Sequence, residues 1–334
     1  MDRNVGVVVL RLGKLAHSIH ECECGDEIVE LERALERVVD LAPIRGCHSG
    51  SIYHRRHRMT ICTESAPVPT NARTHERRAG REFVLEIVFR PLARLLAPLF
   101  LRARISPPAI VLANTAAGIL AAAVLVRGEL VLAALLLQLK TLLDNTDGQL
   151  ARISGRVTLT GRYLDTEADL VVNAAVFAAL GYATGRPWLA FVAFLATTLV
   201  LAADFNVSEL YREVRGEAKQ PPAPLGGRVE QVLGRVYGAV FAPQDHAVRA
   251  FSARRFERVS AGESSDEAVI LAYNDRITVK VLANFGLSTQ LAILGLCLVL
   301  DSPVAYLWLT LGTLAVLPLL QMRRERLAHR ALER

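Results

Sequence analysis

Residues 129–184 read ELVLAALLLQLKTLLDNTDGQLARISGRVTLTGRYLDTEADLVVNAAVFAALGYAT, two apolar runs joined by a polar connection. Each run has the length that crosses a bilayer as a helix. Four aspartates lie where the runs meet the connection: Asp144 and Asp147 end the first run, and Asp165 and Asp169 begin the second. Because charges at membrane depth are costly, such residues usually mark a functional site. The stretch therefore predicts two membrane helices that carry the protein's chemistry.

The composition of the whole chain also indicates a membrane protein. Of its 334 residues, 52% are hydrophobic and only 22% are charged, and the mean hydropathy is +0.30. These values are too apolar for ordinary soluble domains and too low in charge for a disordered chain. The net charge of +6 is then explained by its distribution relative to the membrane, and we predict no nucleic-acid partner.

Six apolar runs are expected to span the membrane, at about 109–126, 129–152, 161–184, 187–205, 279–300 and 302–322. The predicted fold class is therefore all-α, a polytopic membrane protein with six transmembrane helices and an amphipathic interfacial helix before the first span. The short connections on one side carry few basic residues, whereas the other side collects most of them. By the positive-inside rule, both termini and the active site are expected on the cytoplasmic side of the cell membrane.

Composition also divides the chain into parts. The segment 82–107 interleaves arginine with leucine and phenylalanine, as a helix lying in the membrane interface would. The residues at 228–259 are expected to form one or two basic amphipathic helices at the membrane surface or over the cytoplasmic mouth. The predicted organisation is a poorly ordered basic cytoplasmic extension at 1–81, the interfacial helix at 82–107, a six-span domain at 108–322 with an insertion at 206–278, and a basic cytoplasmic tail at 323–334.

The spacing of the four aspartates predicts that they converge. Residues three or four apart share one face of a helix, so Asp144 and Asp147 project together, as do Asp165 and Asp169. The short connection makes the two helices antiparallel neighbours. Four such carboxylates would repel one another unless cations lay between them, and all-oxygen ligands suit Mg²⁺ or Mn²⁺. We therefore expect two divalent ions at this site.

The residues around the aspartates form the pattern Asp144-x2-Asp147-Gly148-x2-Ala151-Arg152-x8-Gly161-x3-Asp165-x3-Asp169. This pattern resembles the signature of the CDP-alcohol phosphatidyltransferase family at every fixed position. The resemblance covers roughly 90–210 and 278–322 and leaves out the N-terminal extension. It implies an enzyme that moves a phosphoryl-linked group from a CDP-alcohol to a hydroxyl acceptor and releases CMP.

The resemblance also implies roles for individual residues. Asp144, Asp147 and Asp165 would be metal ligands, and Asp169 would be the general base and a further ligand. The CDP moiety would be bordered by Asp144, Gly148, Ala151, Arg152 and Gly161, with Arg152 near its phosphates. The residues fit this chemistry independently, because two metals neutralise a reacting diphosphate and a carboxylate can take the proton of an acceptor hydroxyl.

The substrates are less sharply defined. The donor is expected to be CDP-diacylglycerol or a CDP-polyol, and membrane lipids and a second copy of the chain are expected partners. A phosphorylated acceptor such as glycerol phosphate or inositol phosphate would need arginines, for which the candidates are Arg156, Arg162, Arg212 and Arg215. The same arginines also fit the charge bias of cytoplasmic loops. Lys140, one turn before Asp144, either meets negative charge, that of the acidic cluster or of a lipid phosphate, or snorkels to the interface.

Two other classes of protein also fit part of this pattern. An intramembrane prenyltransferase also uses aspartate pairs to hold Mg²⁺ and diphosphate, and the Asp165–Asp169 pair alone would permit it. The glycine and arginine frame favours the CDP-alcohol interpretation. A cation-binding transporter would use intramembrane carboxylates too, but such proteins commonly show internal repeats, and the sequence shows none.

Overall fold

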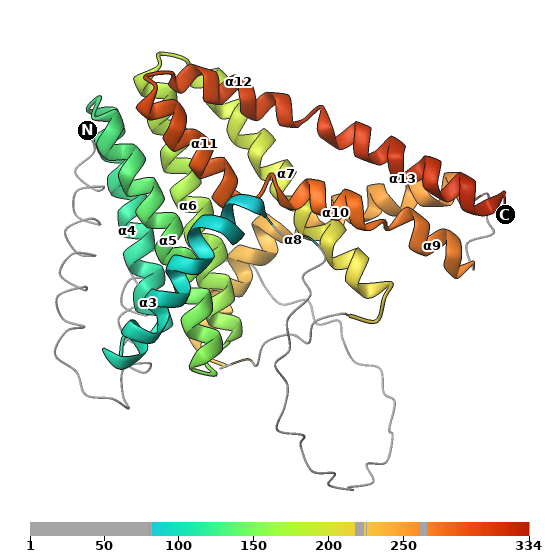
Figure 1. Ribbon diagram of the computed structural model, residues 1–334, viewed down its shortest axis with the longest axis horizontal. Coiled ribbons are helices and arrows are strands. Elements are labelled where there is room, and N and C mark those ends of the chain that lie inside the picture. The colour runs from blue at the N-terminus through green and yellow to red at the C-terminus, as the bar shows by residue number, and fades with distance from the viewer. Residues whose placement is uncertain (1–79, 81, 218–223, 225, 261–265, 334) are drawn as a thin grey trace, which may run out of the picture. The chain divides into compact units, whose positions relative to one another are not determined.

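The computed structural model describes residues 80, 82–217, 224, 226–260 and 266–333. Within these residues the fold is all-α, with helices joined by turns and no strand (Figure 1). Apart from Gly80, the extension predicted at 1–81 lies outside the described residues. The helices are η2 (Leu85–Phe89), α3 (Arg90–Arg102), α4 (Pro107–Val126), α5 (Leu130–Ile153), α6 (Leu159–Ala183), α7 (Pro187–Glu213), α8 (Arg228–Ser260), α9 (Glu267–Tyr273), α10 (Arg276–Ala283), α11 (Leu287–Val299), α12 (Pro303–Thr313) and α13 (Val316–Leu332).

The centre of the fold is formed by α4, which packs against both α5 and α6. Small residues let α4 approach closely: a Cβ added at Gly118 would overlap the side chain of Val172 in α6. The main hydrophobic core lies around these helices and α11, with Leu137, Leu180 and Leu294 fully buried. The sequence predicts that α5 and α6 are direct neighbours. Each instead packs far more extensively on α4 than on the other. A space is thereby kept between α5 and α6 for side chains.

Four stretches of helix are long and apolar enough to cross a membrane: Pro107–Val126, Pro187–Glu213, Glu267–Val299 and Pro303–Leu332. They correspond to the first, fourth, fifth and sixth expected spans. The second and third expected spans are the helices α5 and α6, which are of similar length but carry the ionisable residues of the site. The six-span count stays a prediction for these two helices.

The fifth and sixth spans are less regular than the apolar runs suggested. The run at 279–300 is divided between α10 and α11 by a turn at Asn284–Gly286. The last run is divided between α12 and α13 by a turn after Thr313. α13 then continues well beyond the apolar residues and packs beside α9 and α8 (Figure 1).

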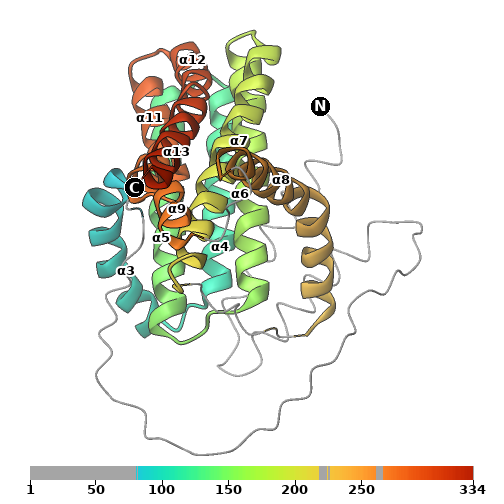
Figure 2. The same ribbon diagram turned by 90° about the vertical axis from the view of Figure 1, so that its right-hand side faces the viewer.

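The segment before the first span and the insertion flank the central helices. η2 and α3 form the helix predicted at 82–107, and α3 turns Ala93 and Ala97 toward the fold while contacting α5. Of the one or two helices expected at 228–259, the structure forms one, α8, which continues through Pro243 and packs on α6, α7 and α13. Figure 2 shows α3 and α8 on opposite sides of the α4–α6 group. The interfacial position of α3 stays a prediction.

Candidate active site

The aspartates of α5 and α6 meet in the space between the two helices. Asp144, Asp147 and Asp165 each place one carboxylate oxygen within 4.8 Å of the corresponding oxygens of the other two. Asp147 is only 5% exposed. Such a group of partly buried like charges is unfavourable without compensation, and it forms because apolar runs on both helices fix their packing against α4.

The group fits a divalent cation. Oδ1 of Asp165 is buried and has no hydrogen-bond partner among the described residues. A buried carboxylate oxygen that lacks a partner is costly, and coordination of a cation would satisfy it. All three side chains offer oxygen, the ligand atom that Mg²⁺, Mn²⁺ and Ca²⁺ prefer. Asp144, Asp147 and Asp165 are therefore the residues that could hold a metal ion.

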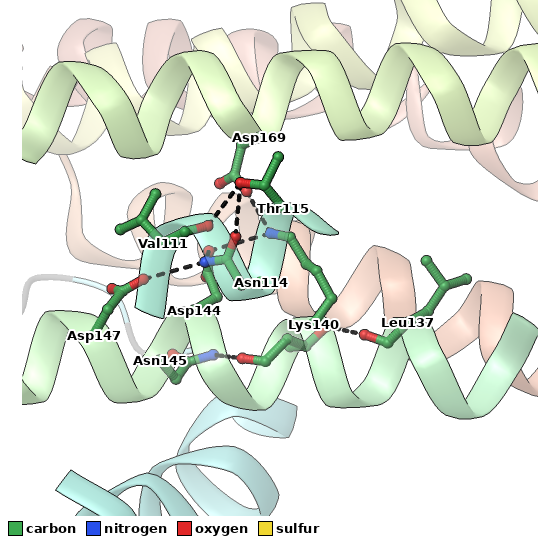
Figure 3. A network of polar contacts seen from close by, with 10 residues as sticks. Val111, Asn114, Thr115, Leu137, Lys140, Asp144, Asn145, Asp147 and Asp169 are labelled. Atoms are coloured by element: carbon green, nitrogen blue, oxygen red, sulfur yellow. Dashed lines mark hydrogen bonds and ion pairs between the residues drawn. The ribbon is translucent and has the colours of Figure 1, made fainter. Parts of the chain in front are cut away.

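An asparagine of α4 contacts the acidic group (Figure 3). Asn114 is 1% exposed, and its Nδ2 donates to Oδ2 of Asp147 at 3.1 Å and lies 3.5 Å from Oδ1 of Asp144. The amide thus orients two carboxylates of the neighbouring helix. Sequence analysis did not assign Asn114 to the site. Its position as a polar residue within an apolar span was the signal that could have found it.

Lys140 and Asp169 form the second part of the site. Lys140 is 1% exposed, and its Nζ donates to Oδ1 of Asp144 at 3.1 Å and to Oδ1 of Asp169 on α6. Figure 3 shows the lysine side chain reaching from α5 toward Asp169. Of the two interpretations of Lys140, charge balance is therefore confirmed. The snorkelling alternative is wrong, because the ammonium is buried between carboxylates rather than directed to an interface.

The small residues of the signature lie along the same helices. A Cβ added at Gly148 would lie 3.6 Å from the guanidinium of Arg152, so this arginine folds back over the glycine. Gly161 is in the first turn of α6, where its N–H donates to the capping hydroxyl of Thr158 at 3.1 Å. Ala151 lies half-buried one turn after Asp147. These residues line the end of α5 and the beginning of α6.

The four arginines proposed for the acceptor have different surroundings. Arg156 is exposed in the α5–α6 connection. Arg162 lies over the ring of Phe205 at 5.7 Å, and Arg212 forms an ion pair with Glu209. Arg215 lies 3.7 Å from the ring centroid of Tyr211 and donates to the carbonyl of Leu271 at 3.4 Å. Arg215, in the turn after α7, is thus engaged with the end of α7 and with α9.

The inserted helix α8 also reaches the start of α6. Thr160 donates to Oε2 of Glu230 at 2.8 Å, and the rings of Tyr163 and Tyr237 have centroids 5.1 Å apart. Tyr237 donates to Asp245 at 3.2 Å, and burial raises the pKa of Tyr237, with the charge of Asp245 adding to the shift. Sequence analysis left the role of this insertion open. Its contacts place α8 beside Gly161 at the edge of the site.

The fold and site together define a helical membrane enzyme whose acidic group fits a divalent cation, and comparisons with known proteins give its family. The family model for CDP-alcohol phosphatidyltransferase matches residues 104–242, from the start of α4 to the middle of α8. A phosphatidylinositol phosphate synthase of Streptomyces avermitilis is 30% identical over 183 residues, which are 53% of this chain and 73% of that protein.

Two further relatives agree with this match. A phosphatidylinositol phosphate synthase of Mycobacteroides abscessus is 31% identical over 157 residues, which are 46% of this chain and 70% of that protein. A bifunctional IPC transferase and DIPP synthase of Thermococcus kodakarensis is 34% identical over 114 residues, 31% of this chain and 26% of that protein. No solved structure matches the chain significantly.

The chain belongs to the CDP-alcohol phosphatidyltransferase family. It is accordingly a multi-pass membrane protein and a CDP-alcohol phosphotransferase. The resemblance drawn from the eight signature residues is confirmed, and the prenyltransferase and transporter alternatives are set aside.

Proposed function

We propose that this enzyme transfers the phosphatidyl group of CDP-diacylglycerol to a hydroxyl of a polyol phosphate and releases CMP. The observation that carries the proposal is the group formed by Asp144, Asp147 and Asp165, with an unpartnered buried oxygen on Asp165, beside the separate carboxylate of Asp169. Three carboxylates fit a cation that binds diphosphate, and a fourth carboxylate nearby fits a base.

The proposed cofactor is Mg²⁺ or Mn²⁺, with two ions expected and the first held by Asp144, Asp147 and Asp165. When bound, such ions supply charge neutralisation at a reacting diphosphate. Asn114 keeps the carboxylate of Asp147 turned toward the group. Asp169 accepts the proton of the attacking hydroxyl. Gly148, Ala151 and Gly161 leave room for the CDP moiety, and Arg152 lies near its phosphates.

The acceptor is proposed from the relatives and from the arginines. Two relatives are phosphatidylinositol phosphate synthases by name, which makes inositol phosphate the first acceptor to test and glycerol phosphate the second. A phosphorylated polyol would be recognised by guanidinium groups, for which Arg156, Arg162 and Arg212 are the candidates. The engagement of Arg215 with Tyr211 and Leu271 supports a structural role for it.

The membrane setting is proposed from charge and composition. The positive-inside bias supports a cytoplasmic active site in the cell membrane, with both termini on that side. The exposed apolar residues of α3, Leu92, Leu95 and Leu99, suit contact with lipid. A homodimer is proposed by analogy with the family alone.

The experiment is a screen of CMP release by the purified full-length protein. CDP-diacylglycerol and soluble CDP-alcohols are each paired with inositol phosphate, glycerol phosphate, inositol and glycerol. The proposal expects release only with CDP-diacylglycerol and a phosphorylated polyol. Release with the unphosphorylated polyols at equal rate would contradict the acceptor assignment, and release only with a soluble donor would contradict the lipid donor.

A further inference from the structure

The inserted helix α8 uses its arginines in two different ways. Its inward face packs on α6, α7 and α13 and carries two arginines that are paired with glutamates of other helices. Arg249 pairs with Glu213 at the end of α7, and Arg255 pairs with Glu325 of α13. These ion pairs join α8 to its neighbours within the fold.

The opposite side of α8 is basic and partly apolar. We call it the outer face, and it comprises six exposed residues: Arg228, Arg235, Val236, Phe251, Arg254 and Arg258. Residues at these spacings lie on one side of a helix. None of the four arginines forms an ion pair with a residue that the structure describes. Of the acidic residues of α8, only Glu257 is exposed, so this side carries a large excess of positive charge.

The apolar residues of the outer face lie among these charges. Val236 is 40% exposed and Phe251 is 56% exposed. Ala239, Ala242 and Ala247 are exposed between them, and their small side chains allow a surface to approach the helix closely. Arginines mixed with exposed apolar side chains are typical of helices that lie in a membrane interface, where phosphates and acyl chains meet.

The position of α8 agrees with this composition. Figures 1 and 2 show the first turns of α8 at the same level along the α4–α6 group as α3, which lies on the opposite side of that group. α3 is predicted to lie in the membrane interface and exposes Leu92, Leu95 and Leu99. A bilayer whose interface meets α3 therefore also meets the beginning of α8.

We propose that the outer face of α8 binds the headgroups of anionic phospholipids. The guanidinium groups of its four arginines contact lipid phosphates, which they match in charge and in hydrogen-bond geometry. Val236 and Phe251 contact the beginning of the acyl chains. The inference goes beyond the proposed reaction and depends only on the chain being a membrane protein.

The test compares an anionic with a neutral lipid. Phosphatidylglycerol with a fluorescent acyl chain is titrated with the full-length protein in detergent, and binding is followed by fluorescence anisotropy. Phosphatidylcholine with the same label is the neutral comparison. The wild type should bind phosphatidylglycerol at least about tenfold more tightly, since each arginine near an anionic lipid surface contributes about fivefold. Added NaCl should weaken this preference, because exposed charges are screened.

The variants change only exposed residues of α8 and α13. Arg254→Gln with Arg258→Gln should reduce the preference for phosphatidylglycerol at least about fivefold and leave phosphatidylcholine binding unchanged. Arg254→Lys with Arg258→Lys keeps both charges and should retain most of the preference. Arg326→Gln with Arg330→Gln is the matched control, because it removes two exposed arginines with the same spacing from α13. This control should bind both lipids as the wild type does.

Three outcomes would overturn the inference: equal binding of the two lipids by the wild type, an unchanged preference in the Arg254 and Arg258 glutamine variant, or an equal loss in the α13 control. The first would show that the outer face meets water or another partner, and the last that only total charge matters. None of these results bears on CMP release, so the proposed function is tested separately.

Discussion

Two polar regions of the molecule differ in how their buried charges are compensated. Where α8, α9 and α13 meet, Arg324 is 4% exposed and donates to the carbonyl of Tyr273, to Ser252 and to Asn274 at 3.0–3.1 Å. Between α5 and α6, Lys140 contacts two of the four carboxylates, and an oxygen of Asp165 has no partner in the part of the chain that the structure describes. The first region is satisfied by the chain itself and joins helices. The second leaves a buried carboxylate oxygen that a bound cation could satisfy.

The largest effect expected from this contrast is that of metal removal. An excess of EDTA should abolish CMP release, because the acidic group then loses the charge that offsets its carboxylates and binds the diphosphate. Mg²⁺ or Mn²⁺ added after removal of the chelator should restore activity. The measurement is initial CMP release against metal concentration.

The region around Arg324 provides the contrast in this experiment. Its hydrogen bonds need no metal. The protein should therefore stay folded in EDTA, with only a small change in its unfolding temperature, while CMP release is lost. Full turnover in excess EDTA would show that the acidic group works without a divalent ion, and the distinction between the two regions would fail.

The next effect separates the proposed base from a proposed metal ligand. Asp169→Asn should lower turnover about 10²–10⁴-fold, the usual contribution of a general base, and added Mn²⁺ should not restore it. Asp147→Asn weakens a ligand, so a higher Mn²⁺ concentration should partly restore its turnover through mass action. Turnover of both variants is measured across one Mn²⁺ titration, with binding of the CDP donor followed in parallel. Near-normal turnover of Asp169→Asn at saturating Mn²⁺ would remove it as the base.

A third effect belongs to the satisfied region. Arg324→Met should lower the free energy of unfolding by at least about 3 kcal/mol, since three acceptors lose a charged donor and each costs about 1–3 kcal/mol. Turnover per folded molecule at low temperature should be unchanged. Arg323→Met is the matched control, because Arg323 is more exposed and pairs only with Asp275 among the described residues. A stable but inactive Arg324→Met would mean that this region takes part in the reaction.

The residues of the acidic site could be predicted from the sequence to different degrees. The four aspartates were found because charge within an apolar run is conspicuous and helical spacing is local. Lys140 was left with two interpretations, because its partner Asp169 lies across the fold, 29 residues later. The support from Asn114 was missed for the same reason, since it depends on the packing of α4 against α5.

The helix bounds show the same limit. The span expected at 187–205 continues to Glu213 because the polar end of α7 is bound by α8, through Asn206 with Asp245 and Glu213 with Arg249. Neither contact has a periodic signature. Apolar periodicity therefore located the helices well and their polar ends poorly.

A smaller effect is expected at the junction between the first helix and α11. Glu82 accepts a hydrogen bond from the backbone N–H of Thr289, and so caps a helix whose own N-cap residue, Gly286, has no side chain. Glu82→Ala should cost about 1 kcal/mol, the usual value of a cap. Glu82→Gln keeps an acceptor and should cost less.

The pH dependence sharpens this prediction. Burial raises the pKa of Glu82 above its ordinary value of 4.5. A raised carboxyl pKa in the folded state favours folding at low pH, and that advantage is lost as the pH rises through the folded-state pKa. Unfolding of the wild type and of Glu82→Gln, measured over this range, should therefore diverge, with the wild type losing stability relative to the variant as the pH rises. A constant difference would exclude titration of Glu82.

The smallest effect is expected from deletion of the N-terminal residues. The site residues proposed for metal, nucleotide and proton transfer all lie beyond residue 140, and the first close packing contact of the described chain is at Gly80, where an added Cβ would lie 2.7 Å from Cβ of Ala283. A chain beginning at residue 79 keeps this contact and the cap from Glu82, so its unfolding temperature and CMP release should equal those of the full chain.

A chain beginning at residue 84 loses both contacts and should unfold at a lower temperature, because α10 and α11 are then no longer held to the first helix. Its turnover per folded molecule should fall less than that of any aspartate variant, since the acidic group is intact. The pair of deletions separates two possibilities: if the chain from residue 79 inserts and folds normally but releases no CMP, residues 1–78 contribute to the reaction itself, and the site is not confined to the helices that carry the aspartates.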